Sequence, residues 1–493
     1  MPEPQNETRN DLYTQVNSML EGADQTTPVS ATVLFKVPAA REKEFICAAD
    51  TLLGATKLLP GLIVFRYQKR RRVAEAPGPA AIQFLIYESW SHVADFRTQW
   101  TSAHLQQFRT SVGGFLAEGP QLAFYLGDSK GIPGEEAAAP RPGGGRENGV
   151  LKTGQAGCWD TGGNPVQGAA ATGQDGDKRS GIPIPHPRFA EKDGTVIDHL
   201  TSLIWLQDAN FFKDVTWDAA LQNAQNLKAG VAGLTDGSKA GDWRLPNINE
   251  LQSLLHLNNA SGPAIADKQM FKNLVCANYW SSSSVAAAPV LGWYTALAVG
   301  PPVFDLKENT MRMWPVRRGY DPVVLQTGEK ICYTTWGVPV DCAGTGQDAD
   351  WRTGLPVPEE RFTDRNDGTV KDELTGLIWA RDANTFGTKT WQEALDACNG
   401  LEADSRGLKD GSKRGDWRLP NFNEMRSLVD YSQAAPALPV GHPFRNVRPS
   451  LYWSSTSVPS APKLARFVFI GMGPGVWDHK NVRLNAWPVR DEK

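Results

Sequence analysis

The sequence predicts an α+β protein in which one small α/β domain precedes two copies of a second α+β domain. The main observation is an internal repeat, because the hexapeptide DWRLPN at residues 242–247 returns at residues 416–421. The stretch YWSS at residues 279–282 returns likewise at residues 452–455. The distance between the copies far exceeds the roughly 20–50 residues of a solenoid repeat, so a whole domain is used twice.

Length and composition set the expected number of domains. At 493 residues the chain accommodates about three domains of roughly 100–200 residues each, so one further domain precedes the two copies. A stretch rich in Gly and Pro around residues 140–145 indicates a linker. We therefore expect a flexible segment at 1–29, the α/β domain at 30–127, the linker at 128–149, and the repeats at 150–320 and 321–493.

The first domain shows alternating strand and helix patterns. Apolar alternation predicts strands at 31–37, 62–67, 82–87 and 121–126, and apolar faces of helical period predict helices at 42–58 and 91–108. This β-α-β-β-α-β order is that of a ferredoxin-like domain. The basic stretch at residues 69–72 is expected to be a solvated loop, with an anion or nucleic-acid patch as the alternative.

Each repeat predicts two helices and several short antiparallel strands packed around Trp side chains. The first helix begins at Trp217 in one copy and at Trp391 in the other, each preceded by a Thr that can cap the helix. The second helix follows Asn247 or Asn421, and in both copies a Glu three residues later completes a capping box.

The charge pattern and the cysteines exclude several classes of protein. A net charge of −3 offers no global basic field for nucleic acid, and no apolar run approaches the ~20 residues of a membrane span. The polar amino terminus lacks a signal-peptide pattern, which predicts a cytoplasmic protein, with export by another route as the alternative. The six cysteines match no zinc spacing, so no metal and no cofactor are expected. Cys332 and Cys342 flank a turn within bridging range and should be reduced in the cytoplasm.

Residues 30–127 resemble the antibiotic biosynthesis monooxygenase domain. The resemblance rests on Phe45, the Pro60-Gly61 turn and the pattern Trp90, Phe96, residues 102–105 (SAHL) and Phe108. It implies a ferredoxin-like fold that pairs across its sheet into a dimeric α/β barrel. It also implies that some members are cofactor-independent oxygenases acting on quinols or aromatic compounds.

The repeats resemble the C-terminal domain of the bacterial collagen-like adhesin Lcl. The resemblance rests on residues 361–379 (RFTDRNDGTVKDELTGLIW), 415–421 (GDWRLPN) and 452–455 (YWSS), with matching residues in the first copy. It implies two tandem C-type-lectin-like α+β domains, related to the formylglycine-generating-enzyme fold, whose later strands and loops bind partners or glycans.

Two late segments differ between copies whose surroundings are repeated, which favours a surface for binding a partner. A solvated hairpin tip is the alternative, although Trp is a residue type favoured at binding hot spots. The candidate binding residues are Phe304, Asp305, Lys307, Trp477, Asp478, His479, Lys480 and Asn481.

Three further features have a structural and a functional interpretation. His104 is a candidate general base or a packed core histidine. Residues 364–368 (DRNDG) suggest either a calcium loop or, from the Asp-Gly pair, a hairpin turn. Arg244 and Arg418 lie at strand-to-helix junctions, where a guanidinium fork for a carboxylate or carbonyls is expected rather than ligand binding.

The sequence thus predicts a non-enzymatic binding or assembly protein. Its first domain would form a homo-oligomer, and its two lectin-like repeats would present recognition surfaces for a protein or glycan. The alternatives are a cofactor-independent monooxygenase of quinols or aromatic compounds with accessory repeats, and a glycan-binding adhesin.

Overall fold

The computed structural model describes residues 29–56, 62–69, 81–90, 93–113, 116, 121–126, 149–166, 172–259, 262–265, 267–298, 300–317 and 323–492. Three predicted segments lie wholly or mostly outside these ranges. They are residues 1–28 of the expected flexible segment, residues 70–72 of the basic stretch and residues 128–148 of the expected linker. The chain divides into two compact units, Met1–Ala138 and Ala139–Lys493, which are described separately.

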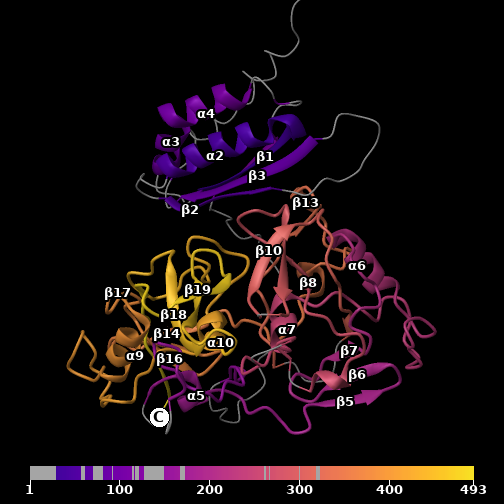
Figure 1. The fold of residues 1–493 in the computed structure, drawn as a ribbon. Helices are drawn as coiled ribbons and strands as arrows, with labels where there is room; N and C mark the ends of the chain where they lie inside the picture. Colours follow the sequence, from indigo (N-terminus) through magenta and orange to yellow (C-terminus); the bar gives the residue numbers. More distant parts are fainter. Residues whose placement is uncertain are drawn as a thin grey trace, which may run out of the picture. The chain divides into compact units, whose positions relative to one another are not determined.

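The first unit contains a four-stranded antiparallel sheet in the order β2-β3-β1-β4. Its elements are β1 (Val29–Pro38), η1 (Ala39–Arg41), α2 (Glu42–Thr56), β2 (Leu62–Lys69), β3 (Ala81–Trp90), α3 (Val93–Trp100), α4 (Ala103–Gly113) and β4 (Gln121–Leu126). The helices lie on one side of this open sheet (Figure 1). The ferredoxin-like order predicted from the sequence is therefore confirmed.

An aromatic cluster forms the core between the sheet and the helices. The Phe35 ring lies 5.2 Å from that of Phe45 and 5.8 Å from that of Phe108. The prediction of a single helix over residues 91–108 is wrong, because residues 101–102 interrupt the helix and separate α3 from α4. There Ser102 donates its hydroxyl to the carbonyl of Gln99 (2.6 Å) and accepts from the Leu105 amide (3.3 Å), which starts a new helix.

The second unit contains both repeats, and each has two sheets. The first repeat has sheets β11-β7-β6-β5 and β10-β9-β8, and the second has β14-β15-β16-β22 and β17-β21-β18-β19-β20. The strands of the first repeat are β5 (Phe189–Lys192), β6 (Thr195–Asp198), β7 (Ile204–Leu206), β8 (Asn278–Ser284), β9 (Leu291–Ala296), β10 (Pro302–Leu306) and β11 (Val316–Arg317). Those of the second are β14 (Phe362–Asp364), β15 (Thr369–Asp372), β16 (Leu377–Ala380), β17 (Thr388–Lys389), β18 (Leu451–Ser457), β19 (Leu464–Phe469), β20 (Gly475–His479), β21 (Leu484–Asn485) and β22 (Val489–Asp491).

The predicted helices are present in both repeats. They are α6 (Trp217–Asn226), α7 (Ile248–Ser253), α9 (Trp391–Asn399) and α10 (Phe422–Ser427), with a short η2 at Lys268–Met270. Capping boxes are complete at α7, α9 and α10. Trp217 and Trp391 are fully buried and donate their indole N–H to the carbonyls of Ser281 (2.7 Å) and Ser454 (2.8 Å). These bonds fix each first helix to the strand that carries the YWSS stretch, β8 in the first repeat and β18 in the second.

The two junction arginines act as structural forks, as predicted. Arg244 donates two hydrogen bonds of 2.6 Å to the Glu250 carboxylate, and Arg418 does the same to Glu424 at 2.7 and 2.8 Å. All four side chains are buried, and each Glu also closes its capping box. The fork therefore ties the strand before each helix to the first turn of that helix.

The Asp-Gly segment at residues 364–368 is the hairpin turn between β14 and β15. The Asp367 carboxylate accepts from the amide (2.9 Å) and the hydroxyl (2.6 Å) of Thr369. Gly368 has a φ of 88°, and a Cβ at this position would lie 2.6 Å from the carbonyl oxygen of Gly407. The turn therefore requires glycine for both its conformation and its close approach to the neighbouring loop.

The repeats exchange amino-terminal segments, which we call the first arm (residues 149–182) and the second arm (residues 323–355). The first arm begins on the second repeat, where the Gly149 amide donates to the carbonyl of Thr375 (2.6 Å), and it keeps a contact with its own repeat, whose Leu257 amide donates to the carbonyl of Thr153 (2.7 Å). Its helix α5 (Asp175–Lys178) packs on β18 of the second repeat. Figure 1 shows α5 beside the orange and yellow elements of that repeat.

The second arm makes the reciprocal crossing. Its hairpin strands are β12 (Cys332–Tyr333) and β13 (Pro339–Val340), and its helix α8 (Asp348–Trp351) packs on β8 of the first repeat. The N-cap residues of α10 and α7 also bond the arm of the other repeat. Asn421 donates to the carbonyl of Ser180 in the first arm, and Asn247 donates to that of Thr353 in the second arm, both at 3.2 Å. The two repeats are consequently interlocked.

A buried carboxylate anchors each arm to the opposite repeat. Asp175 accepts hydroxyl hydrogen bonds from Thr153 and Thr456, both at 2.6 Å, and Asp348 accepts one from Ser283. Burial raises the pKa of each carboxyl to about 6, and the hydroxyl hydrogen bonds oppose this rise. Because the folded pKa lies above the unfolded value, the ionised carboxylates destabilise the fold above about pH 6. This cost is relieved as the pH falls towards 4.

The Asp348→Asn variant tests this pH dependence. As the pH falls from 7 to 4, wild type is expected to gain up to about 3 kcal/mol of unfolding free energy relative to the variant, which carries no titrating group at this position. Urea unfolding at several pH values measures the difference. The matched control is Asp396→Asn, at an exposed carboxylate; this variant keeps Asp348, so it should gain stability with falling pH as wild type does. Equal slopes for wild type and Asp348→Asn would contradict the assignment.

Candidate binding surface

The two candidate segments lie on neighbouring edge strands. β10 pairs only with β9, and β20 only with β19, among the described strands. The two strands contact each other where the repeats meet, and a Cβ on Gly475 would lie 3.4 Å from the ring of Pro302. The fold thus brings residues 302–306 and 475–479 together, although they come from different copies.

The aromatic residues of these strands are partly exposed. Phe304 is half-buried and packs edge-on against Trp293, with ring centroids 5.3 Å apart. Trp477 is also half-buried and lies opposite Arg466 in the pairing of β19 and β20. Both rings therefore keep part of their surface available for contact.

The polar candidates divide into turn residues and exposed residues. Asp305 accepts from the Leu306 amide (2.8 Å), and Asp478 accepts from the His479 amide (2.7 Å), so both carboxylates hold the turn after the strand. His479 and Asn481 are exposed. They are the two polar candidates that a partner can reach most readily.

The two candidate lysines lie inside the protein. The Lys307 ammonium lies 3.8 Å from the centre of the Trp217 ring and donates to the Ser284 hydroxyl (2.8 Å). The Lys480 ammonium lies 4.0 Å from the Trp391 ring and donates to the carbonyl of Trp159 in the first arm (3.0 Å). Burial lowers the pKa of both lysines to about 7. Each lysine therefore lies over a core Trp ring and close to the arm of the other repeat, Lys307 near Tyr333 and Lys480 near Trp159.

The hairpin of the second arm carries exposed apolar side chains that the sequence reasoning did not select. The exposed fractions are 60% for Trp336, 57% for Val338, 45% for Ile331 and 38% for Val340. The corresponding hairpin of the first arm has Gly162 and Asn164 where the second has Trp336 and Val338. The sequence does contain a signal for this hairpin, because Trp336 of the second copy aligns with Gly162 of the first.

In this structure a disulfide between Cys332 and Cys342 closes this hairpin, whereas the sequence analysis expects the two cysteines to be reduced. The Cα atoms lie 5.1 Å apart, so the prediction that these cysteines come within bridging distance is confirmed. The Thr335 hydroxyl donates to the Asp218 carboxylate on α6, which holds the turn against the first repeat. The apolar side chains are therefore presented on a constrained hairpin.

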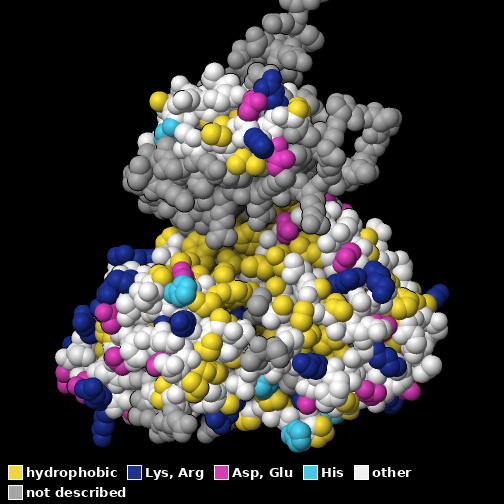
Figure 2. All heavy atoms as spheres, viewed as in Figure 1, with side chains coloured by type: hydrophobic (Ala, Val, Ile, Leu, Met, Phe, Trp, Pro, Cys, Tyr) yellow, Lys and Arg dark blue, Asp and Glu magenta, His cyan; other side chains and the backbone are white. Residues whose placement is uncertain are grey.

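We call the exposed and half-buried apolar side chains of the hairpin and the edge strands the apolar face (Phe304, Trp336, Val338 and Trp477). Tyr333 of the hairpin lies 5.9 Å from the Lys307 ammonium at the end of β10, which places the hairpin beside that strand. Figure 2 shows hydrophobic side chains gathered over this part of the unit, around β10 and β19. The arrangement can bind a complementary apolar surface.

In the first unit, His104 is half-buried on α4, and its Nε2 lies 2.7 Å from the side-chain oxygen of the buried Gln99. Trp100 is buried and packs against Phe96, with ring centroids 5.8 Å apart, as expected for a core residue. The side chain of Trp90 lies outside the described residues. His104 thus packs against the side-chain amide of the buried Gln99. This contact fits a structural role, and His104 also remains a candidate base.

Comparison with known proteins identifies a family for the repeats. The sequence model of the Lcl C-terminal domain matches residues 194–317 and again residues 368–490, which together make up half of the chain. No curated protein matches the chain.

Solved structures similar to this chain match its amino-terminal region. One is described as a candidate antibiotic biosynthesis monooxygenase from Nitrosomonas europaea, with 21% identity, 21% of this chain and 94% of that chain covered, and a TM-score of 0.17. Another, from Caulobacter crescentus and described in the same way, has 15% identity, covers 21% of this chain and 93% of its own, and has a TM-score of 0.18.

Proposed function

We propose, from the premise that this chain belongs to the Lcl C-terminal domain family, that it is a non-enzymatic binding or assembly protein. The repeats would bind an apolar protein surface through the apolar face. The first domain would pair through its sheet into a homodimer, because a small ferredoxin-like sheet has an apolar face to cover. The resemblance of the repeats to C-type-lectin-like domains, whose late strands and loops bind partners, agrees with this role.

The single observation that carries the proposal is the exposed hairpin. Trp336 is 60% exposed on a turn that a disulfide closes and a hydrogen bond to α6 supports. A constrained aromatic residue loses little conformational entropy on binding, and Trp is enriched at binding hot spots. In a dimer each apolar face would occur twice, so that weak contacts would add up to a higher avidity.

The repetition between the copies supports a scaffold rather than an enzyme. The features shared by the two copies are capping boxes, arginine forks and buried Trp side chains. Each of these features stabilises the fold. The copies differ at the hairpin turn and at three of the five late positions, Phe304/Trp477, Leu306/His479 and Glu308/Asn481. The other two pairs, Asp305/Asp478 and Lys307/Lys480, are repeated and make the same structural contacts in both copies.

Sedimentation of the full-length protein over a range of concentrations tests this function. Changing Trp336→Gly and Val338→Asn together gives the second hairpin the residues of the first, so the fold should tolerate the change. We expect this variant, and the variant with Trp477→Ala and His479→Ala, to keep the dimer formed by the first domain but to form larger assemblies at least tenfold more weakly than wild type. The matched control is Val440→Ser, which removes an apolar side chain that is 83% exposed elsewhere on the second repeat.

The alternative functions are outcomes of the same series of variants. If both double variants associate as wild type does, while His104→Ala abolishes a measurable oxidation of a quinol, the oxygenase replaces the binding protein. Suppose instead that immobilised glycans retain the wild-type protein but not the double variant with Trp477→Ala and His479→Ala. The glycan-binding adhesin would then be the better account of the function than the protein-binding scaffold.

The cytoplasmic location is also part of the proposal and has its own test. In that compartment the Cys332–Cys342 pair would be reduced, and the pairing of β12 with β13 and the Thr335–Asp218 hydrogen bond would hold the hairpin. Among the described residues, no helix combines the length and the apolar character needed to cross a bilayer. Alkylation of protein taken unfolded from its native source should modify all six cysteines if the compartment is reducing. Modification of only Cys47, Cys158, Cys276 and Cys398 would show the Cys332–Cys342 disulfide and place the protein in an oxidising compartment.

A further inference from the structure

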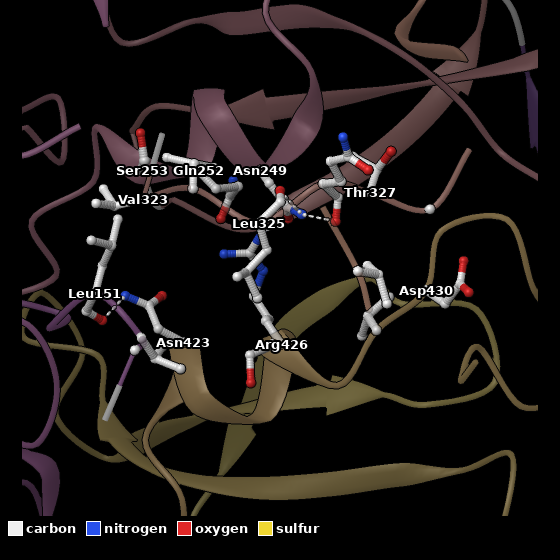
Figure 3. A pocket seen from close by; sticks show the side chains of 18 of the residues that line it. Leu151, Asn249, Gln252, Ser253, Val323, Leu325, Thr327, Asn423, Arg426 and Asp430 are labelled. Carbon is white, nitrogen blue, oxygen red and sulfur yellow. Dashed lines mark hydrogen bonds between the residues drawn. The ribbon is translucent and has the colours of Figure 1, made fainter. Parts of the chain in front are cut away.

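A pocket lies between the two repeats, where equivalent residues of both copies face each other. Asn423 on α10 donates to the carbonyl of Leu151 in the first arm (2.9 Å), and Asn249 on α7 donates to that of Leu325 in the second arm (3.1 Å). Figure 3 shows these pairs on opposite sides of the pocket. The cavity has a volume of about 70 Å³, which exceeds the space of a single water molecule.

One charged residue breaks the symmetry of the pocket. Position 252 on α7 is Gln, whereas the equivalent position on α10 is Arg426. Arg426 is only 8% exposed and lines the pocket. Its guanidinium donates to the side-chain oxygen of Asn249 (3.3 Å) and to the Tyr431 hydroxyl (3.4 Å), which are long hydrogen bonds to neutral groups.

Arg426 differs in this respect from four other buried arginines of the repeats. Arg188, Arg244, Arg361 and Arg418 each form an ion pair with a buried carboxylate at 2.6–2.8 Å. Within the described part of the chain, no carboxylate lies within ion-pair distance of Arg426, and its Nε has no hydrogen-bond partner. A buried cation without a counter-charge is unfavourable, so this position is prepared for an anion.

The rest of the pocket indicates which kind of anion fits. Val150 and Val324, together with Leu151 and Leu325, provide apolar walls. Asp430 lies at the far side of the pocket from the Arg426 guanidinium in Figure 3, and one of its oxygens accepts from the amide and the hydroxyl of Ser432. An inorganic anion would use the cation alone, whereas an anion with an aliphatic part would also cover the apolar walls.

We propose that this pocket binds a short-chain aliphatic carboxylate. The carboxylate would pair with the Arg426 guanidinium, which offers the planar fork that a carboxylate matches, and the aliphatic part would lie between Leu151 and Leu325. Because the walls come from both arms, the bound ligand would hold the two repeats together. This site is separate from the apolar face and stands whether or not that face binds a partner.

The test uses the full-length protein and sodium isobutyrate as the probe, with calorimetry and the thermal midpoint Tm as readouts. We expect saturable binding and a Tm that rises by several degrees at about one hundred times Kd. The neutral isobutyramide, which has the same shape, should give neither. Sodium chloride and sodium phosphate at equal ionic strength should bind at least tenfold more weakly than isobutyrate. Equal binding of phosphate would overturn the carboxylate assignment.

Two variants complete the test. Arg426→Gln installs the residue of the equivalent position and should weaken isobutyrate binding at least tenfold, while its Tm without ligand equals or exceeds that of wild type. Leu325→Phe keeps the charge but fills the pocket, and it should also lose binding. A much lower Tm for ligand-free Arg426→Gln would show that Arg426 is a satisfied structural residue. That result, unchanged binding by either variant, or no saturable binding by wild type, would overturn the proposal.

Discussion

Replacing Arg244 by Met is expected to lower the free energy of unfolding of the repeat unit by about 3–5 kcal/mol. The substitution keeps much of the side-chain volume but removes the cation that pairs with Glu250 at 2.6 Å. The Glu250 carboxylate is 1% exposed and would remain buried with only the Asn247 amide (2.9 Å) and the Thr353 hydroxyl (3.0 Å) as donors. An uncompensated buried charge of this kind accounts for the size of the loss.

Urea unfolding followed by Trp fluorescence measures this effect. The matched control is Arg483→Met, which breaks the ion pair of Arg483 with Glu393, where both side chains are about half exposed. Solvent screens such a pair, so this variant should unfold at nearly the same urea concentration as wild type. If both variants lose the same stability, the fork is not the structural element described above.

Replacing Trp391 by Ala is the second change with a large expected effect, again about 3–5 kcal/mol. The indole is fully buried in the core of the second repeat and donates to the carbonyl of Ser454 (2.8 Å). Its ring also supports the Lys480 ammonium, which reaches the first arm. The substitution therefore creates a cavity, leaves a carbonyl without its donor and loosens the contact between the repeats.

The same unfolding experiment includes an exposed Trp as control. Trp336→Ala removes an equally large side chain from a position that is 60% exposed, and we expect little change in stability. A loss below about 1 kcal/mol for Trp391→Ala would contradict its place in the core. A large loss for Trp336→Ala would mean that the hairpin tip is part of the folded core rather than a surface for a partner.

Local features of the structure could be predicted from the sequence because neighbouring residues determine them. The Asn421 cap, the Trp391 helix face and the Asp-Gly turn at Gly368 each depend on a few adjacent positions. The break between α3 and α4 was missed because the apolar period continues across it. It depends on the hydroxyl of Ser102, which helical periodicity does not include.

The candidate surface could be predicted only in part. The late strands were selected because the copies differ there, and that comparison led to Phe304 and Trp477, which keep exposed surface. The same comparison aligns Lys307 with Lys480, and this repetition was the sign of a structural role. The two lysines were nevertheless grouped with the surface candidates, because a lysine in a charged stretch is most often solvated, whereas both are buried against Trp rings. Arg426 was missed because its isolation depends on contacts between the two repeats, which are distant in sequence.

The exchanged arms determine the order in which the newly made chain can complete its fold. The first repeat cannot bury β8 fully until residues of the second arm, including Asp348, have left the ribosome. The first arm must wait longer, because its partners Thr456 and Lys480 follow Asp175 and Trp159 by 281 and 321 residues. A chain that stops after the first repeat would leave its first arm undocked and the second-arm site of that repeat empty. Quality control could distinguish it from the finished protein by that exposed surface.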